Sequence, residues 1–557
     1  MSEEIKVTIV IDDEKQNMEK GGESKRTVTV THDLSMTLMS TLLKNNLIEG
    51  SFCGGRGDCG RCMVQFIERA PFPTQLERNR LDAQELRQGF RLACLARPKD
   101  DCVIKLVFPK EREISIVTEM MDLSENIDSK GQTQKPSVKR KLDVTESEGM
   151  YRDARQVGDS VAAIMETDVT ANTGAIKKDR DSYIVAVDLG TTTIAMQLRA
   201  LDTGETADTY CEMNPQRTYG ADVLSRIQAS CEGHREVLRQ CVWDVLEKGV
   251  RRFSQKVGKK AVAAVCIAGN TTMAHLFMGY DVISLGKSPF VPVETGLQNC
   301  VGPLGIPIYI TPGISAFVGG DIVAGLYALE MLPGFGKAQG RLEDLVQDRE
   351  AVRLLIDLGT NGEMAVTDGK RMLVTATAAG PAFEGGTRKA VVGTDMIAVT
   401  ASLMKEGILD ETGLLAEPYF TQGVHIHTKK GALGLTNQDI RALQMAKAAV
   451  RAGAEILWEQ MGRPKIEQVY LAGGFGYYLD VEAAVGIGLL PKRLRGSVLA
   501  VGNTSLEGAF RMGRDLYRGK IDGRMLDEAV SSIESINLAK QAAFEGLYLQ
   551  YMNLCEN

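Results

Sequence analysis

The sequence has no uninterrupted apolar run of about 18 residues, the length that a helix needs to span a bilayer. Its first residues, MSEEIKVTIVIDDEK, lack the basic start and the apolar stretch of a secretion signal. Basic residues are not in excess, because the formal net charge is -7, so no basic face of the kind that binds nucleic acid is expected. These absences predict a cytoplasmic protein with neither a membrane span nor a nucleic-acid partner.

The 557 residues are too many for one hydrophobic core, and 44% hydrophobic with 25% charged residues is an ordinary globular composition, so several domains are expected. Eleven cysteines without a secretion signal favour thiols or metal ligands over a disulfide framework. Four of them cluster by spacing. The scattered remainder are expected to be mostly small core residues: Cys102, Cys211, Cys231, Cys241, Cys266, Cys300 and Cys555.

The first 110 residues read as strands around one helix. The predicted strands are IKVTIVI (5–11), RTVTVTH (26–32), RCMVQFI (61–67) and CVIKLVF (102–108), and the predicted helix is SMTLMSTLLKNNL (35–47). The pattern predicts a small α+β domain over residues 1–110.

Within this domain, CGGRGDCGRC (53–62) places three cysteines and four glycines in ten residues. Five residues separate Cys53 from Cys59, two separate Cys59 from Cys62, and 31 separate Cys62 from Cys94. Plant-type ferredoxins hold a [2Fe-2S] cluster with a similar spacing, one residue shorter in the first gap, and the extra residue resembles the adrenodoxin subgroup. Glycines would let backbone N–H groups approach the cluster sulfurs. The four cysteines are therefore interpreted as cluster ligands, with structural zinc as the alternative, although zinc sites more often use two short cysteine pairs.

Residues 111–180 differ in character from both flanks. They are polar and mixed in charge, as in KGQTQKPSVKRKLDVTESEG, and Tyr151 is their only aromatic residue. Such a segment cannot bury enough apolar area to offset its ordering entropy, which predicts a flexible linker.

An internal repeat begins after residue 181. IVAVDLGTTTIAMQLRALDTGE (184–205) and LLIDLGTNGEMAVTDGK (354–370) share an apolar strand, the tetrapeptide DLGT and a second strand. Each copy is followed by an apolar strand that ends in a small-residue turn, VCIAGN (265–270) and VYLAGG (469–474). The repeat predicts two related α/β lobes in residues 181–557, at roughly 181–350 and 351–540, with a ligand crevice at the carboxyl ends of their strands.

The repeated turns carry the groups that ATP needs. Asp188 and Asp357 end strands, where a carboxylate could hold Mg²⁺ directly or through water. Glu363 is a candidate to orient the attacking water, and a solvated turn carboxylate is the alternative. Gly and Thr also mark plain hairpin turns, but two copies that face each other favour phosphate binding. The candidate ATP contacts are Gly190, Thr191, Thr192, Thr193, Gly269, Asn270, Gly319, Gly320, Asp321, Gly359, Thr360, Asn361, Gly473 and Gly474.

Several residues keep two interpretations. The Gly-Gly-Asp run at 319–321 either caps a helix or turns a helix N-terminus toward phosphate. Asp222 and Arg226 form a helical i,i+4 pair, or they contact ATP or a partner. His425 and His427 alternate in strand fashion without cysteine or carboxylate neighbours in the sequence, so no metal role is expected for them.

The DLGT, AGN and AGG set resembles the phosphate-1, phosphate-2 and adenosine motifs of the superfamily that includes acetate and sugar kinases, Hsp70 and actin. The stretches that narrow the resemblance are NPQRTYGADVLSRI (214–227), SPFVP (288–292), TPGISAFVGGDIVAG (311–325) and AAGPAFEGG (378–386). With a ferredoxin domain in front, residues 1–110 and 181–540 resemble the reductive activators of corrinoid proteins. Some members carry a middle domain where this chain has only the polar segment, so a dimer contact made by that domain is not carried over.

The resemblance implies a β-grasp [2Fe-2S] ferredoxin domain followed by a two-lobed acetate kinase/Hsp70/actin-like (RNase H-like) ATPase domain. It implies the cofactors [2Fe-2S], ATP and Mg²⁺, and it implies transfer of one electron from the cluster to the Co(II) corrinoid protein of a methyltransferase system, which regenerates Co(I). The reduction potential of a plant-type cluster is about -400 mV, and that of the corrinoid couple is expected to be lower, so the electron transfer would be uphill. ATP would drive it by shifting the equilibrium between two lobe arrangements. The expected partners are that corrinoid protein and a low-potential electron donor, and a homodimer is left open.

Two other functions use the same motifs. A small-molecule kinase would phosphorylate an acid or a sugar between the lobes, which leaves the ferredoxin domain without a task. A redox-sensing switch would bind ATP and use the cluster as a sensor rather than as an electron carrier.

Overall fold

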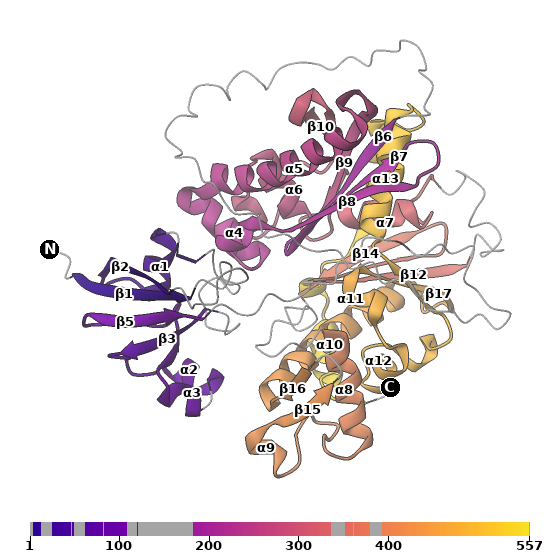
Figure 1. Cartoon of the computed structure of the whole chain (residues 1–557). Helices are drawn as coiled ribbons and strands as arrows, with labels where there is room; N and C mark the ends of the chain where they lie inside the picture. The colour runs from indigo at the N-terminus through magenta and orange to yellow at the C-terminus, as the bar shows by residue number, and fades with distance from the viewer. Residues whose placement is uncertain are drawn as a thin grey trace.

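The computed structural model describes residues 4–12, 25–45, 47–48, 62–81, 83–107, 120, 182–335, 351–359, 361–378, 393–428 and 431–555. These residues form one five-stranded sheet, two six-stranded sheets and one two-stranded hairpin. Figure 1 shows the N-terminal sheet in indigo, the first six-stranded sheet mainly in magenta and the second in salmon and orange.

The N-terminal domain is a mixed sheet in the order β2-β1-β5-β3-β4. β1 pairs with β2 in antiparallel and with β5 in parallel orientation, and β3 runs antiparallel to β5 and β4. Its elements are β1 (Glu4–Asp12), β2 (Lys25–Asp33), α1 (Leu38–Lys44), β3 (Met63–Glu68), α2 (Gln75–Arg80), α3 (Ala83–Arg87), β4 (Phe90–Leu92) and β5 (Cys102–Leu106).

The predicted strands and helix of this domain are confirmed, and the mixed sheet around α1 is the expected β-grasp arrangement. The helix is shorter than predicted because Thr37 caps it, its side chain accepting a hydrogen bond from Ser40 N. Leu38 and Leu42 of α1 pack against Val7 and Ile104 of the sheet in one buried core. The sequence pattern missed α2, α3 and β4, which are too short to show a period.

The first lobe is built on the sheet β10-β11-β9-β6-β7-β8. Its helices and strands are β6 (Tyr183–Leu189), β7 (Thr193–Ala200), β8 (Thr206–Met213), α4 (Val223–Ala229), α5 (Arg235–Val257), β9 (Val262–Gly269), α6 (Thr271–Met278), β10 (Gln298–Val301), β11 (Pro307–Ile310) and α7 (Gly320–Ala328).

The second lobe is built on the sheet β18-β17-β12-β13-β14-β19, with the hairpin β15-β16 beside it in the chain. Its elements are β12 (Val352–Leu358), β13 (Gly362–Thr367), β14 (Met372–Thr377), α8 (Gly393–Lys405), α9 (Tyr419–Gln422), β15 (Val424–Thr428), β16 (Gly431–Leu435), α10 (Asn437–Gln460), β17 (Ile466–Ala472), α11 (Gly473–Tyr478), α12 (Val481–Gly486), β18 (Val498–Gly502), α13 (Thr504–Tyr517), α14 (Gly523–Ser531), β19 (Glu534–Ser535) and α15 (Phe544–Gln550).

The two six-stranded sheets repeat one topology. In each, the strand that ends in DLGT has an antiparallel neighbour on one side, and on the other side the parallel strand that ends in the small-residue turn. Asp188 pairs with Ala268 of β9, and Asp357 pairs with Ala472 of β17. The predicted internal repeat is thus confirmed, and it places both aspartates at the carboxyl ends of equivalent strands.

Helices α7 and α13 pack against each other between the two sheets (Figure 1). α7 follows the first sheet in the chain, yet its Val323 and Leu326 pack with Leu355 of the second sheet. α13 follows the second sheet, yet its Phe510 packs with Ile184 of the first. Each lobe therefore contributes a helix to the core of the other.

The α7–α13 crossing depends on a glycine. A Cβ built on Gly508 would lie 1.9 Å from the carbonyl oxygen of Ala324, so only glycine allows the two backbones to approach this closely. An ion pair joins Arg199 of β7 to Glu507 of α13. Although burial favours the protonated acid, Arg199 and Arg511 lower the pKa of Glu507 to about 2, so the pair is charged at neutral pH.

Met120 is the one described residue between 107 and 182. It forms an isolated antiparallel bridge with Gly502, at the end of β18, and its side chain packs against the second-lobe core that contains Val501 and Leu526. At this point the predicted linker contacts the ATPase domain. The rest of the predicted linker lies outside the described residues.

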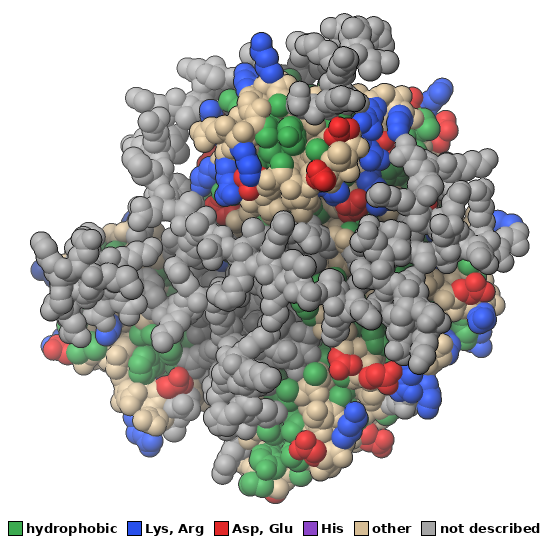
Figure 2. Space-filling model, turned by 45° about the vertical axis from the view of Figure 1, so that its right-hand side comes forward, with side chains coloured by type: hydrophobic (Ala, Val, Ile, Leu, Met, Phe, Trp, Pro, Cys, Tyr) green, Lys and Arg blue, Asp and Glu red, His purple; other side chains and the backbone are tan. Residues whose placement is uncertain are grey.

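The described part of the chain contains no helix that is long and apolar enough to cross a membrane. Figure 2 shows acidic and basic side chains interspersed over the described surface of one face. Ion pairs join several charged side chains of the described residues, as in Arg252 with Asp208 and Arg251 with Glu247.

Gly508→Ala should destabilise the two-lobed domain, because the added methyl group overlaps the Ala324 carbonyl and forces the helices apart. Overpacking of this kind costs about 1–3 kcal/mol, so calorimetry should show a lower melting temperature. Gly546→Ala is the control, since nothing lies within 4 Å of a Cβ built on Gly546 in α15. Equal melting temperatures for the two variants would contradict the close crossing.

Candidate functional site

Two of the four predicted cluster ligands meet at one point. Cys62 directly precedes β3 and Cys94 follows β4, and the backbone N–H of Ala93 donates to the carbonyl of Cys62 over 2.7 Å. The two Sγ atoms lie 3.2 Å apart, too far for a disulfide and close enough to be ligands of one centre. Cys53 and Cys59 lie outside the described residues. The thiol pair is the chemistry that a [2Fe-2S] cluster requires, so the described residues fit the group.

The scattered cysteines follow the core prediction in part. Cys102, Cys211 and Cys266 are buried, and burial raises the pKa of Cys266 to about 12. Thiols of this kind are inert packing groups. Cys231 is exposed.

Asp188 lies near the end of β6 and receives hydrogen bonds from the other lobe. Asn503 Nδ2 donates to its Oδ2 over 2.8 Å, and Ser505 Oγ donates to its Oδ1 over 3.0 Å. Burial raises the pKa of Asp188, and these two bonds oppose the rise. The carboxylate is therefore held in one orientation by the residues that start α13.

Asp357 occupies the equivalent place in the second lobe. It pairs across the sheet with Glu363 on β13, and Glu363 is buried with 8% of its surface exposed. Gly473, at φ +81°, passes so close that a Cβ there would lie 2.5 Å from Asp357 Oδ1. Glycine is thus required where the small-residue turn meets this carboxylate.

These carboxylates raise one another's pKa values. Burial, then the charges of Asp321 and Asp188, raises the pKa of Asp357 to about 7. Burial raises the pKa of Asp321 to about 7 as well, and Asp188 adds to the effect. Burial also raises the pKa of Glu363 well above its usual value, with Asp321 and Asp357 contributing. The site therefore gathers negative charge that a divalent cation would stabilise.

Within the described ranges, no group of three or more His, Cys, Asp or Glu side chains is close enough to hold a metal unaided. Mg²⁺ does not require one, because it is usually bound by one or two carboxylates together with phosphate oxygens and water. Asp188 and Asp357 fit such a role, and the charge of Asp321 contributes to the raised pKa of Asp357.

The candidate phosphate contacts of the first lobe come together. Asn270 Nδ2 donates to Thr191 Oγ1 over 3.1 Å, which joins the AGN turn to the DLGT turn. A Cβ built on Gly269 would lie 3.0 Å from the Leu189 carbonyl, and one on Gly319 would lie 2.5 Å from Asn270 Cα. The loop before α7 therefore packs directly on the AGN turn.

The remaining predicted residues fall at the expected turns. Gly190 N–H donates to the Thr193 carbonyl, which closes the first DLGT turn, and Gly359 N–H donates to the Asn361 carbonyl in the second. The other members of the set are placed as follows: Thr192 in the first turn, Gly320 and Asp321 in the first turn of α7, and Gly473 and Gly474 at the start of α11. Thr360 lies outside the described residues. ATP contact by this set stays a prediction.

Sequence reasoning missed Asn503 and Ser505. A signal was present in the sequence, since GNTS (502–505) resembles GNTT (269–272). In both, a strand is followed by an asparagine that caps a helix and by small hydroxyl residues.

Asp222 caps α4 by accepting from Ser225 N over 2.8 Å, while the guanidinium of Arg226 donates to the carbonyl of Thr191 over 2.5 Å. His425 and His427 lie in β15, and their side chains are outside the described part.

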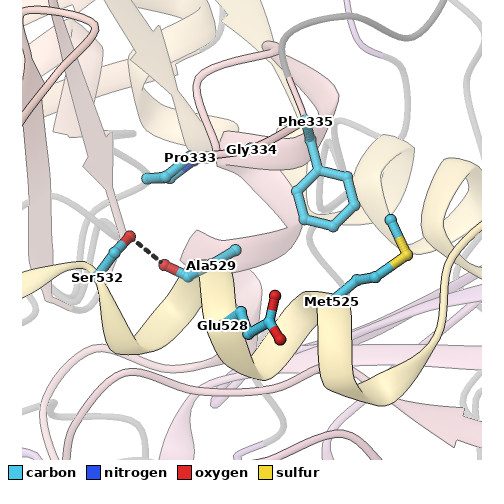
Figure 3. Close-up of a pocket in the computed structure, with 7 residues that line it drawn as sticks. All are labelled: Pro333, Gly334, Phe335, Met525, Glu528, Ala529 and Ser532. Carbon is cyan, nitrogen blue, oxygen red and sulfur yellow. Dashed lines mark hydrogen bonds between the residues drawn. The ribbon is translucent and has the colours of Figure 1, made fainter.

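A surface hollow of about 260 Å³ lies away from these residues. Figure 3 shows Phe335 pointing from one wall toward α14, which supplies Met525, Glu528 and Ala529 to the other wall. None of the predicted site residues lines it, so it has no part in the candidate chemistry.

The fold and its two sites define the class of protein, an iron–sulfur domain joined to a two-lobed ATPase domain of the acetate and sugar kinase, Hsp70 and actin type. Comparison with known families agrees. Residues 23–99 match the 2Fe-2S iron-sulfur cluster binding domain, residues 183–333 match the RACo middle region, and residues 351–390 and 386–557 match the C-terminal domain of RACo, the ASKHA domain. The chain has the domain set of the RACo family, and the resemblance predicted from the sequence is confirmed.

Individual relatives carry corresponding names. The corrinoid activation enzyme RamQ of Eubacterium limosum is 28% identical over 403 residues, which cover 60% of this chain and 64% of the relative. The [Co(II) methylated amine-specific corrinoid protein] reductase of Methanosarcina barkeri is 22% identical over 449 residues, which cover 66% of this chain and 76% of the relative. A solved structure, reductive activator for corrinoid,iron-sulfur protein, has a TM-score of 0.58 and 23% identity and covers 99% of this chain and 98% of its own. This last likeness shows the fold.

Cys94→Ser should destroy the cluster absorbance and leave ATP binding intact, because the thiol and the nucleotide residues belong to separate cores. Visible spectra and calorimetric ATP titration of anaerobically purified protein measure both. The exposed Cys231→Ser is the control and should keep the cluster. Loss of ATP affinity in step with cluster absorbance would refute the separation.

Asp357→Asn should lower ATP hydrolysis by about 10²-fold or more, because it removes charge placed to hold the metal, while the cluster spectrum is unchanged. Phosphate release measures the rate. Asp202→Asn, in the exposed turn after β7, serves as the control. Wild-type turnover in Asp357→Asn would reject the metal role.

Proposed function

We propose that this chain is an ATP-dependent reductive activator of corrinoid proteins, which passes one electron from its [2Fe-2S] cluster to a Co(II) corrinoid protein of a methyltransferase system and regenerates Co(I). The observation that carries the proposal is the presence, in one chain, of a β-grasp domain with paired cysteine thiols and a two-lobed ATPase domain with aspartates at equivalent strand ends. The names of the relatives support the choice of a corrinoid acceptor.

In the N-terminal domain, Cys62 and Cys94 would hold the cluster together with Cys53 and Cys59. The bound cluster supplies a one-electron carrier. The buried core of α1 and the sheet fixes Cys94, which is 4% exposed, and leaves Cys62 nearer the surface. Cys62 would thus be the described ligand nearer to solvent, on the side where a partner protein can approach.

In the ATPase domain, Asp188 and Asp357 would hold Mg²⁺ directly or through water. Asn503 and Ser505 orient Asp188, and Glu363 lies next to Asp357 where it could orient the attacking water. The glycines of the DLGT, AGN and AGG turns would admit the phosphates to close backbone contact.

The α7–α13 crossing supplies the coupling. Because each helix belongs to the core of the opposite lobe, a nucleotide that binds both DLGT turns changes the position of one lobe relative to the other. ATP can shift the equilibrium between the two lobe arrangements only by the difference between its binding free energies for them. We propose that the shift makes an otherwise uphill electron transfer proceed in one direction.

The low-potential electron donor, a cytoplasmic location and the tether role of residues 111–180 stay predictions from the sequence, and a homodimer is left open. The chain matches 64% of the length of RamQ, so the activity and the partner are proposed for this chain on its own residues.

Reduced protein mixed with a Co(II) corrinoid protein should form Co(I) with ATP and far less without it. The visible spectrum of the corrinoid reports the product, and phosphate release reports hydrolysis in the same sample. Equal Co(I) formation with and without ATP would reject the proposal.

Two further arms separate the rival functions. A small-molecule kinase would convert candidate acids or sugars to phosphorylated products in the absence of corrinoid protein. A redox-sensing switch would show an ATPase rate that depends on the oxidation state of the cluster alone. We expect neither result.

A further inference from the structure

The first DLGT turn is held from behind by one segment of the chain. Asn214 Nδ2 donates to the carbonyl of Gly190 over 2.8 Å, and Arg226 Nη2 donates to the carbonyl of Thr191 over 2.5 Å. The backbone N–H of Asn214 donates to the carbonyl of Thr192 over 2.9 Å. Three successive carbonyls of the turn therefore accept hydrogen bonds from residues 214–226.

Arg226 is held on every side that the structure describes. It is an arginine with none of its surface exposed. Its Nε donates to the carbonyl of Gly220 over 2.9 Å, and its Nη1 donates to Gln216 Oε1 over 3.2 Å and lies 3.1 Å from Met273 Sδ. The guanidinium of Arg226 thus connects two residues that precede α4, Gln216 and Gly220, to Thr191 of the first DLGT turn.

The partners of Arg226 are fixed as well. Asn214 and Gln216 are fully buried, and Gln216 Nε2 donates to the carbonyl of Leu238 in α5. Gly220 is required for the approach, because a Cβ there would lie 2.8 Å from the backbone nitrogen of Arg226. The cluster of Asn214, Gln216 and Arg226, which we name the carbonyl clamp, has little freedom to move.

The clamp determines what the turn presents to a ligand. In a trans peptide the C=O and N–H point in opposite directions, so fixing the carbonyls of Gly190, Thr191 and Thr192 also fixes the directions of the N–H groups that are linked to them. Successive backbone N–H groups held in this way form an anion-binding concavity. A fully buried arginine is costly to desolvate, so its presence behind a phosphate turn calls for a role that an apolar residue could not fill.

We propose that Arg226 is a positioning residue of the nucleotide site: with Asn214 it fixes the peptide orientation of the first phosphate turn and places a buried positive charge behind the phosphates. This rests on the proposed function, because it requires that the turn bind ATP. Arg226 acts through the backbone of residues 190–192 and need not touch the nucleotide.

The test compares ATP, ADP and adenosine as ligands of the full-length protein by calorimetric titration. Arg226→Lys keeps the charge, but a single ammonium cannot reach Gly220, Gln216 and Thr191 together. It should weaken ATP and ADP binding by about tenfold or more, while adenosine affinity and cluster absorbance stay near wild type; the melting temperature should fall, because Gly220 and Gln216 lose a buried partner. Arg226→Met, which also loses the charge, should weaken ATP further than Arg226→Lys.

The control is Arg252→Lys, on α5, where the guanidinium binds Asp208 and is half exposed. It should bind all three ligands as wild type does. Wild-type ATP affinity in folded Arg226→Lys and Arg226→Met would overturn the proposal. An equal loss of ATP and adenosine affinity would also overturn it, because that pattern marks a purely structural role. If the wild-type protein itself fails to bind ATP, the proposed function fails and this inference fails with it, whereas wild-type binding with unaffected variants rejects the inference alone.

Discussion

The close crossing of α7 and α13 is the constraint on which the two-lobed domain depends. At Gly508 the helix backbones approach to a distance that any side chain would prevent, and each helix is buried in the lobe to which it does not belong by sequence. The two sheets are therefore connected through the α7–α13 contact. Their DLGT strands then end near one another, and Asp188 comes within hydrogen-bonding distance of Asn503 from the opposite half of the chain.

This arrangement concentrates unfavourable charge. Burial raises the pKa of Asp188, Asp321, Asp357 and Glu363, and the charges of neighbouring carboxylates raise it further for Asp321, Asp357 and Glu363. In the proposed function, a cation that arrives with its phosphate ligands would stabilise the ionised forms of these carboxylates. The residues proposed to bind the cation are thus the ones with raised pKa values, while the surrounding cores are apolar.

The sequence predicts those parts of the site that are local in the chain. The repeated DLGT turns and the small-residue turns each lie next to one strand, and three of the four cysteines lie within ten residues, so pattern and spacing are sufficient to predict them. Asn503 lies 315 residues from Asp188, and Arg226 lies 35 residues from Thr191. The first contact depends on the helix crossing, and the second depends on the position of the buried Arg226 side chain. Neither follows from the periodicity of the sequence. The short elements α2, α3 and β4 escaped for a different reason, since they span fewer than two helical turns or a single pleat.

If residues 111–180 tether the iron–sulfur domain as proposed, the bridge between Met120 and Gly502 would limit the reach of that domain. Twelve residues, 108–119, separate the described end of that domain from Met120. Fully extended, this stretch reaches at most about 45 Å. The 61 residues from 121 to 181 begin and end on the ATPase domain, so their length adds nothing to that radius. Met120 pairs with Gly502, and the next residue is Asn503, which donates a hydrogen bond to Asp188. The segment that leads to the iron–sulfur domain is therefore attached next to the residue that orients Asp188.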